Sequence, residues 1–333
     1  MKYTYSTFIV ILSVALYNEE RGCSERMKIM QKRRLGSSDL YVSPISLGCM
    51  SIGTDEKQAL QIIDKALDLG INYLDTADLY DKGWNEELVG KAIRQKRNEI
   101  ILATKVGNHL QDDGTWYWDP SKAYIKQQVK ESLRRLQTDY IDLYQLHGGT
   151  IDDPIDETIE AFEELVKEGV IRYYGISSIR PNVIREYVKR SNIVSVMMQF
   201  SLFDRRPEES ILDLLAKNNI SVVTRGTVAK GMLSNQGQAI IDKKGKDGYL
   251  SYTYEELKRT YLELESLLNE KQSMNGLAIQ YVLSQPAVAS AVIGGSSIQQ
   301  LEENFQAYHE TFSEDQIQQA QAVTQANYYK DHR

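Results

Sequence analysis

Four side chains that can move protons stand at or near the ends of apolar sequence segments. Asp75, Lys105 and His147 each end such a segment, and Tyr80 follows Asp75 closely. A tyrosine hydroxyl has an ordinary pKa of about 10, but a neighbouring ammonium stabilises the phenolate and lowers that pKa. We expect Lys105 to supply this charge, Asp75 to keep the ammonium charged, and His147 to donate a hydrogen bond to a carbonyl oxygen. The set predicts a proton donor aimed at a developing alkoxide.

Eight short apolar segments alternate with amphipathic segments of helical spacing. We expect strands at 42–50, 71–77, 99–106, 140–147, 170–178, 193–200, 220–226 and 288–295. Helices are predicted between them, for example at 55–69 and 155–168, where apolar residues recur three and four positions apart. The alternation predicts parallel strands, and eight of them predict a closed α/β barrel, the (β/α)8 TIM barrel. The active sites of such barrels lie at the carboxyl ends of the strands, where these four residues fall.

The chain has no interior linker rich in Pro, Gly or Ser, so residues 30–333 are expected to form a single barrel domain. Two segments depart from the repeat. One is a long connection after the seventh strand, at 227–253, and the other is an extra helical pattern at 313–329. The extra helix either caps the barrel or mediates contacts, and the sequence does not fix the oligomeric state.

Residues 1–29 form an N-terminal extension with an apolar run at 8–16 behind a single basic residue, Lys2. The run has the length of a signal-peptide core and is too short to span a bilayer. No clean small-residue cleavage site follows it, and a second methionine, Met27, stands just before the patterned part of the sequence. We therefore favour an over-long start assignment, with Met27 as the initiator, over an export signal.

Composition excludes several classes of protein. The 333 residues are 42% hydrophobic and carry a net charge of −7, which argues against disorder and against a nucleic-acid partner. Two cysteines, Cys23 and Cys49, cannot make a disulfide framework, so we expect a reducing, cytoplasmic location and no membrane partner for the mature domain. The four histidines have no metal-ligand spacing, so no metal site is predicted. Reducing equivalents must then come from a bound cofactor.

Several motifs together resemble the aldo-keto reductases. They are GINYLDTADLY (70–80), NEELVGKAI (85–93), ILATKVG (101–107), DLYQLH (142–147), GISS (175–178) and VIGGSSIQQLEEN (292–304). The resemblance runs in order from about residue 34 to the end of the barrel. It implies a (β/α)8 fold, hydride transfer from a nicotinamide cofactor to a small-molecule aldehyde or ketone, and a catalytic tetrad. The tetrad is Asp75, Tyr80, Lys105 and His147, with Tyr80 as general acid.

No G-x-G-x-x-G motif follows a strand, so a Rossmann site is not supported. The segment 292–297 is the candidate phosphate cradle, because two glycines allow close approach and a helix begins near Ser297; a plain turn with a serine cap is the alternative. The resemblance implies cofactor contacts from Met50, Ser177, Ser178, Gln199, Arg225, Gly226, Thr227, Val228, Lys230, Gly231, Gly294, Gly295, Ser296, Gln300, Glu303 and Asn304.

Two positions depart from the family pattern. Ser178 stands where the family usually has Asn, and Arg225 stands where many members stack an aromatic ring on the nicotinamide. The charge of Arg225 disfavours the cationic, oxidised ring, so we expect reduced cofactor to bind more tightly. No Lys or Arg occurs between Lys271 and Lys330, where members that prefer NADPH often place one. NADPH is our first expectation and NADH its rival.

A cationic segment in the long connection bears on the same question. Lys243, Lys244 and Lys246 either fold over a 2′-phosphate or belong to a solvated loop.

The substrate pocket is expected to be lined by Met50 and by aromatic residues from the loops, Trp84, Trp116 and Trp118, with Tyr117 beside them. Aromatic walls suit apolar or aryl aldehydes, and the physiological substrate is not predicted. A redox sensor or regulatory subunit that binds cofactor with little turnover, as in channel-associated relatives, is the main alternative function. A class I aldolase with Lys105 as its Schiff-base lysine is disfavoured because Asp75 stabilises the ammonium. The tetrad argues against a purely structural barrel.

Overall fold

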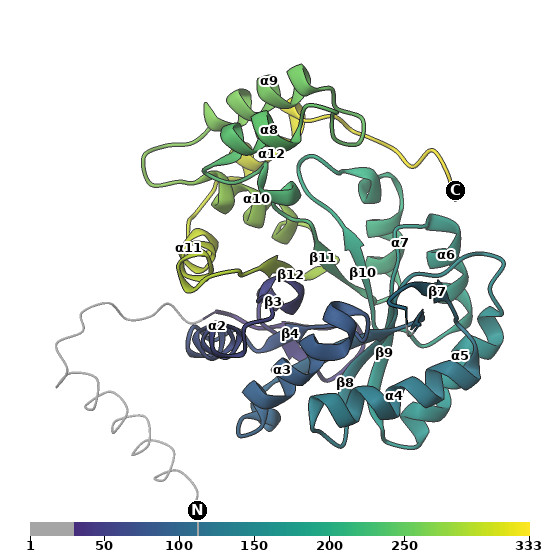
Figure 1. Cartoon of the computed structure of the whole chain (residues 1–333). Coiled ribbons are helices and arrows are strands. Elements are labelled where there is room, and N and C mark those ends of the chain that lie inside the picture. Colours follow the sequence, from purple (N-terminus) through teal and green to yellow (C-terminus); the bar gives the residue numbers. More distant parts are fainter. Residues whose placement is uncertain (1–29, 112) are drawn as a thin grey trace, which may run out of the picture. The chain divides into compact units, whose positions relative to one another are not determined.

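The computed structural model describes residues 30–111 and 113–333, and Gln31–Arg333 form one compact unit. Parallel strands close into an eight-stranded barrel in the order β10-β11-β12-β3-β4-β5-β8-β9, and β12 pairs with β3 to complete it (Figure 1). The strands are β3 (Ile45–Gly48), β4 (Tyr73–Asp75), β5 (Ile101–Val106), β8 (Ile141–Leu146), β9 (Ile171–Ser177), β10 (Ser195–Gln199), β11 (Ser221–Arg225) and β12 (Val288–Gly294). The predicted TIM barrel and its eight strand positions are confirmed.

Helices follow the strands and lie around the barrel (Figure 1). They are α2 (Glu56–Asp68), α3 (Trp84–Ile93), α4 (Lys122–Leu136), α5 (Ile155–Lys167), α6 (Pro181–Arg190), α7 (Ile211–Lys217), α10 (Met274–Leu283) and α11 (Ile298–Tyr308). Their inward faces are apolar; in α2, for example, Ala59, Ile62 and Ile63 are buried, as the spacing predicts. The Asp55 side chain starts this helix by accepting a hydrogen bond from the Gln58 amide.

A short antiparallel hairpin of β1 (Arg33–Arg34) and β2 (Tyr41–Val42) closes one end of the barrel. Arg33 Nη1 donates to the carbonyl oxygens of Leu283 and Val288, both at 2.9 Å, which places the hairpin at the amino end of β12. Val42 was expected in the first barrel strand, but it pairs in this hairpin because Pro44, which has no amide hydrogen, separates the two segments. The opposite, carboxyl ends of the strands are left free for a site.

One hairpin and one long connection are added to the βα repeat. β6 (Asn108–Leu110) and β7 (Trp116–Trp118) form an antiparallel pair after β5. The long connection after β11 contains a 3-10 turn η5 (Ala229–Gly231), a helix α8 (Gly237–Lys244) and then α9 (Tyr254–Glu265). Lys243 and Lys244 therefore end a helix instead of lying in an open loop, and their side chains are exposed.

The extra helix, α12 (Glu314–Val323), is shorter than the predicted 313–329 and packs beside α9 and α10. Its chain leaves helical geometry at Thr324, which has φ −100° and ψ 151°. Arg205 Nη1 binds the carbonyl oxygens of Gln321 and Thr324 at 2.8 and 3.1 Å, so a tertiary contact satisfies the end of the helix. Residues 324–333 continue as an extended segment, named here the C-terminal tail.

No helix within residues 30–111 or 113–333 is both long and apolar enough to cross a membrane. The predicted N-terminal extension, with its apolar run and Met27, lies outside the described residues.

Candidate active site

Lys105 lies at the centre of the site and is completely buried. β4 ends at Asp75 and the adjacent β5 carries Lys105, so both side chains are held by neighbouring parallel strands. Lys105 Nζ donates to Asp75 Oδ2 at 2.6 Å and to the carbonyl oxygen of Thr76 at 2.7 Å. Burial lowers the pKa of Lys105, but the attraction of Asp75 and Tyr80 outweighs burial and raises that pKa above its ordinary value. Lys105 is therefore an ammonium group at neutral pH.

Tyr80 follows β4 and begins the short turn η2 (Tyr80–Gly83). Its hydroxyl oxygen accepts a hydrogen bond from Lys105 Nζ at 3.3 Å. Burial raises the pKa of Tyr80, and this effect exceeds the lowering by the Lys105 charge. Lys105 lowers the pKa of Tyr80, as predicted, but the net shift is upward, because the desolvated pocket disfavours the phenolate more than the ammonium favours it. Tyr80 keeps its proton at neutral pH and can donate it.

His147 directly follows β8, and its amide donates to the carbonyl oxygen of Val106 at 2.7 Å. Its ring meets the Tyr80 ring edge-on, with 5.9 Å between the ring centroids. Burial, with Lys105 and Arg225 nearby, lowers the pKa of His147 to about 3. The imidazole is neutral and offers one N–H to an oxygen beside Tyr80. The four predicted residues are thus brought together.

Buried polar side chains form a hydrogen-bond network around the Lys105–Asp75 ion pair. Thr76 Oγ1 donates to Asn85 Oδ1 at 2.7 Å, and Asn85 Nδ2 donates to the carbonyl oxygen of Cys49 at 2.8 Å. Gln145 Nε2 lies 3.5 Å from Asp75 Oδ1. These contacts tie the loop after β4 to α3 and to the turn that follows β3, and they place Gln145 of β8 against Asp75.

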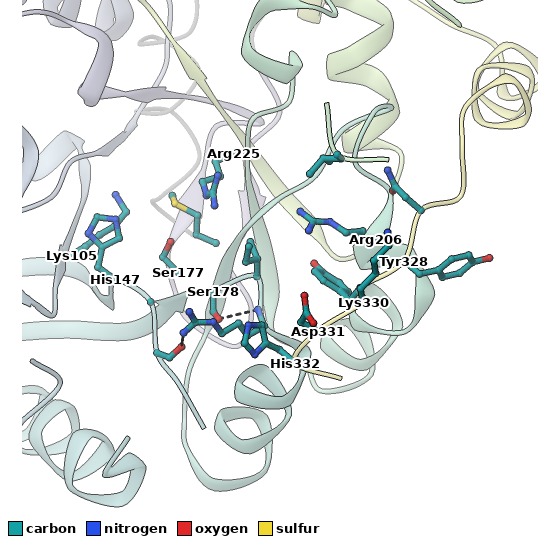
Figure 2. Close-up of a pocket in the computed structure, with 18 of the residues that line it drawn as sticks. Lys105, His147, Ser177, Ser178, Arg206, Arg225, Tyr328, Lys330, Asp331 and His332 are labelled. Carbon is teal, nitrogen blue, oxygen red and sulfur yellow. Dashed lines mark hydrogen bonds between the residues drawn. The ribbon is translucent and has the colours of Figure 1, made fainter. Parts of the chain in front are cut away.

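The tetrad faces a cavity of about 820 Å³ at the carboxyl end of the barrel. Figure 2 shows Lys105 and His147 on this cavity. Tyr80, Lys105 and His147 line it directly, and Asp75 lies behind Lys105. Of the expected cofactor contacts, the residues that line it are Met50, Ser177, Ser178 and Arg225. Reactive and binding groups therefore share one cavity.

Gln199 and Arg225 lie side by side because β10 pairs with β11 in that register. Arg225 Nη1 donates to Gln199 Oε1 at 3.0 Å, and Gln199 Nε2 donates to the hydroxyl oxygen of Tyr249 at 3.0 Å. Ser178 is tied to the same region, since its amide donates to the carbonyl oxygen of Met197. A planar ligand bound here would contact the Arg225 guanidinium and the Gln199 carboxamide, which are already hydrogen-bonded to each other.

The segment after β11 forms a compact turn. Gly226 and Gly231 have positive φ angles of 69° and 91°, and the amide of Leu233 closes the turn on the carbonyl oxygen of Val228. Thr227 Oγ1 lies 3.0 Å from Thr224 Oγ1. Lys230 is exposed at the edge, 5.9 Å above the Tyr249 ring.

The turn from β12 into α11 is capped by its own side chains. Ser297 Oγ accepts the Gln300 amide at 3.2 Å, and Gln300 Oε1 accepts the Ser296 amide at 2.9 Å. Gly294 packs on Ser51, whose Oγ would be 3.0 Å from an added Cβ, so a side chain there would have to displace the Ser51 hydroxyl. These amides are held by neutral oxygens that an anionic oxygen can replace, so the turn suits a phosphate.

The other expected contacts near α11 are already engaged. Asn304 is buried between Gly294 and Asn275, and Glu303 bonds Gln299 on the surface of α11.

A model of the Aldo/keto reductase family matches residues 44–325. This chain belongs to the aldo/keto reductase family. It is 62% identical over 309 residues to an uncharacterized oxidoreductase, YqkF, of Bacillus subtilis (strain 168), covering 91% of this chain and all of that one. It is 32% identical to the aldo-keto reductase YhdN of the same organism, covering 82% of this chain and 87% of that one.

Solved structures of aldo-keto reductases are also similar to this chain. The aldo-keto reductase AKR11C1 from Bacillus halodurans, in its holo form, matches with a TM-score of 0.86 and 58% identity, covering 91% of this chain and 99% of that one. A glycerol dehydrogenase, AKR11B4 from Gluconobacter oxydans, matches with a TM-score of 0.79 and 26% identity, covering 90% of this chain and 98% of that one. The family acts on carbonyl groups and uses nicotinamide cofactors, and its members are oxidoreductases.

The aromatic residues expected around the substrate lie elsewhere in this aldo/keto reductase, and only Met50 of that set lines the cavity. Trp84 Nε1 is bound to the carbonyl oxygen of Thr54 at 3.1 Å, outside the lining. Trp116 and Tyr117 lie on the exposed β6–β7 hairpin. Trp118 lies behind the cavity lining, because its ring packs on Gly107 and on Gly148, which lines the cavity.

The C-terminal tail supplies lining residues that the sequence did not reveal. They are Asn327, Tyr328, Tyr329, Lys330, Asp331 and His332, joined by Arg180, Arg206 and Leu250. Figure 2 labels Tyr328, Lys330, Asp331, His332 and Arg206 among them. Asn327 anchors the tail by donating to the carbonyl oxygen of Phe203 at 3.1 Å and accepting the Arg205 amide at 2.7 Å. Nothing in the sequence signals this role, because residues 327–329 fall within the predicted helical pattern and residues 330–332 follow it.

Among the described residues, no group of three or more His, Cys, Asp or Glu side chains could hold a metal ion.

Proposed function

We propose that this aldo/keto reductase reduces a small-molecule aldehyde or ketone to an alcohol with NADPH, and that Tyr80 is the general acid. The observation that carries the proposal is the Tyr80 hydroxyl, which keeps its proton in a buried pocket and is hydrogen-bonded to the Lys105 ammonium. A neutral His147 stands beside it as a hydrogen-bond donor for the carbonyl oxygen. When bound, the reduced nicotinamide supplies the hydride.

The chain's own groups then handle the proton. The substrate oxygen sits between the Tyr80 hydroxyl and the His147 N–H, which orient the carbonyl carbon toward the cofactor side of the cavity. As negative charge grows on that oxygen, Tyr80 donates its proton, and the adjacent Lys105 ammonium stabilises the phenolate that remains. Asp75 holds Lys105 in place throughout, because both are buried and 2.6 Å apart.

Residues on three strand ends support the cofactor placement. Ser177, Ser178 and Gln199 would hold the nicotinamide carboxamide, and Arg225 would stack on the ring and favour its reduced form. The glycine turn after β12 and the start of α11 would hold a phosphate. NADPH remains our first choice and NADH its rival, because Ser296 and Gln300 are uncharged.

We also propose that residues 30–333 form the working domain and that the protein resides in the cytoplasm.

The test is loss of reduced-nicotinamide absorbance with NADPH and NADH in parallel, across aryl aldehydes, aliphatic aldehydes, dicarbonyls and ketones. We expect turnover of at least one of these carbonyl compounds, and Tyr80→Phe should lower kcat by about 10²- to 10⁴-fold. Tyr328→Phe is the matched control, because Tyr328 lines the same cavity but is 58% exposed, and kcat should stay within twofold. An unchanged kcat in Tyr80→Phe would reject this residue as the acid. Tight cofactor binding without turnover of any carbonyl would favour a regulatory subunit instead.

A further inference from the structure

The cavity is cationic although the chain as a whole is anionic. The protein carries a net charge of −7. The basic residues that line the cavity are Lys105, Arg180, Arg206, Arg225 and Lys330, and Asp331 is the single carboxylate among its described lining residues. A concave site of one sign attracts ligands of the opposite sign.

Two of these cations are already neutralised. Lys105 is paired with Asp75. Arg206 binds the buried Asp204 through both carboxylate oxygens, each at 2.7 Å. Within the described part of the chain, no carboxylate lies within ion-pair distance of Arg180, Arg225 or Lys330. The charge available to a ligand therefore comes from these three residues.

Arg180 is the best-placed cation for a substrate. It follows β9 at the carboxyl end of the barrel and is half-buried. Its amide donates to Ser178 Oγ at 3.2 Å, and its Nη1 donates to the carbonyl oxygen of Gly149. A guanidinium has five N–H donors, so most of them are left for a ligand. The side chain is held by one bond and keeps its charge uncompensated.

The strand order separates Arg180 from the proposed phosphate cradle. β9 neighbours β8, which positions His147, whereas the cradle follows β12 on the far side of β10 and β11. Arg225, at the end of β11, lies on the cofactor side. Arg180 therefore lies away from the phosphate cradle and next to Ser177 and Ser178, the proposed nicotinamide contacts, so it is near the place where a carbonyl would meet the nicotinamide.

The C-terminal tail brings Lys330 to the same side. The carbonyl oxygen of His332 accepts the amide of Asn182, so the tail runs beside the segment that carries Arg180. Figure 2 shows Lys330 and Asp331 across the cavity from Lys105 and His147. Asp331 offsets one charge next to Lys330, which leaves Arg180 as the main anchor.

We infer that this cavity selects carbonyl substrates that carry a carboxylate away from the reacting carbonyl, with Arg180 binding the carboxylate and Lys330 adding to the attraction. The inference rests on the proposed carbonyl reduction. It assigns Arg180 a role in specificity, since a planar guanidinium can bind both oxygens of a carboxylate.

The experiment compares 4-carboxybenzaldehyde with its methyl ester, which differ in charge at one position. For the wild-type protein we expect a higher kcat/KM with the acid than with the ester. In Arg180→Gln the ratio of the two kcat/KM values should fall by at least roughly tenfold, because a charge-assisted hydrogen bond is lost. Gln can still donate to the Gly149 carbonyl oxygen. Lys189→Gln, an exposed position on α6, is the matched control and should leave the ratio unchanged.

Terephthalate binding, measured by calorimetry, gives a readout without turnover. We expect Arg180→Gln to raise its dissociation constant at least roughly tenfold and Lys330→Gln to raise it less. Equal ratios in wild type and Arg180→Gln, or equal terephthalate affinities, would overturn the inference while leaving carbonyl reduction standing. Absence of turnover with either aldehyde would instead count against the proposed function, and the calorimetry would still decide whether Arg180 binds carboxylates.

Discussion

The cavity has one wall built by the ends of β4, β5 and β8 and another built by the C-terminal tail and Arg180. In the first, which we call the tetrad wall, Lys105 has no exposed surface and Asp75 is 4% exposed, and the groups are linked by short hydrogen bonds. In the second, the tail wall, Lys330, Asp331 and Tyr328 are exposed and are held only through anchors such as Asn327. Both walls face the same cavity.

The difference separates two tasks. The chemical step needs fixed positions and a protected proton, which barrel strands supply because their register is set by the core. Recognition of a particular substrate needs charges that water can reach and that variable segments can change. The walls should therefore respond differently to substitution.

The largest effect is expected at the buried ion pair of the tetrad wall. Lys105→Met leaves the Asp75 carboxylate buried without a partner, and we expect the free energy of unfolding to fall by about 3–5 kcal/mol, with loss of turnover. Urea denaturation measures this. The double variant Asp75→Asn with Lys105→Met should recover most of the stability but none of the activity. A double variant no more stable than Lys105→Met would show that the pair is not the cause.

A second buried acid behind the tetrad wall predicts a pH effect. Burial, together with the charge of Glu86, raises the pKa of Asp78 from its ordinary value of 3.8 to about 8. Between these values the folded chain binds one more proton than the unfolded chain, so stability falls as pH rises, by up to about 1.4 kcal/mol per pH unit. In Asp78→Asn this part of the pH dependence of stability should be absent, because an amide side chain does not titrate.

The measurement compares unfolding of wild type and Asp78→Asn at two pH values between 4 and 8. The stability of the variant relative to wild type should increase with pH. Asp247→Asn, at an exposed position, serves as control. Parallel pH profiles for wild type and Asp78→Asn would mean that Asp78 is ionised in the folded protein throughout.

A smaller effect is expected where the tail wall is anchored. Asn327→Ala removes the bonds to the Phe203 carbonyl oxygen and the Arg205 amide, which should cost about 1–2 kcal/mol locally. Opening of the tail should become roughly 5–30 times more frequent, seen as faster carboxypeptidase digestion followed by mass spectrometry. Asn218→Ala, on the exposed end of α7, should digest like wild type. Equal digestion of Asn327→Ala and wild type would show that other contacts hold the tail.

The smallest effect is expected outside both walls. Trp116 is 54% exposed on the β6–β7 hairpin and does not line the cavity. Trp116→Ala should change kcat/KM for aryl aldehydes by less than about twofold, whereas Met50→Ala should change it more. A large loss in Trp116→Ala would place the hairpin against the substrate and add a third wall.

The tetrad wall could be predicted from sequence because each of its residues has a fixed place in the βα repeat. Asp75, Lys105 and His147 end strands whose apolar character is plain, and the barrel brings strand ends together. The net pKa shift of Tyr80 could not be predicted, because it depends on how far burial exceeds the Lys105 charge in three dimensions.

The tail wall could not be predicted for a different reason. The helical pattern continues past Val323, and only the contact of Arg205 with the carbonyl oxygens of Gln321 and Thr324 marks where the helix stops. The tryptophans of the loops were expected in the substrate pocket but do not line it. Residues far away in the sequence hold them by hydrogen bonds, such as Thr54 for Trp84 and Asp153 for Trp118.

The position of the tail has a consequence for the order in which the protein is made. Every barrel strand ends by Gly294, whereas the tail wall uses residues 327–332. During synthesis the tetrad leaves the ribosome well before the segment that completes the pocket. A nascent chain can therefore hold its tetrad and Arg180 in a forming barrel while the C-terminal tail, which completes the pocket, is still inside the ribosome.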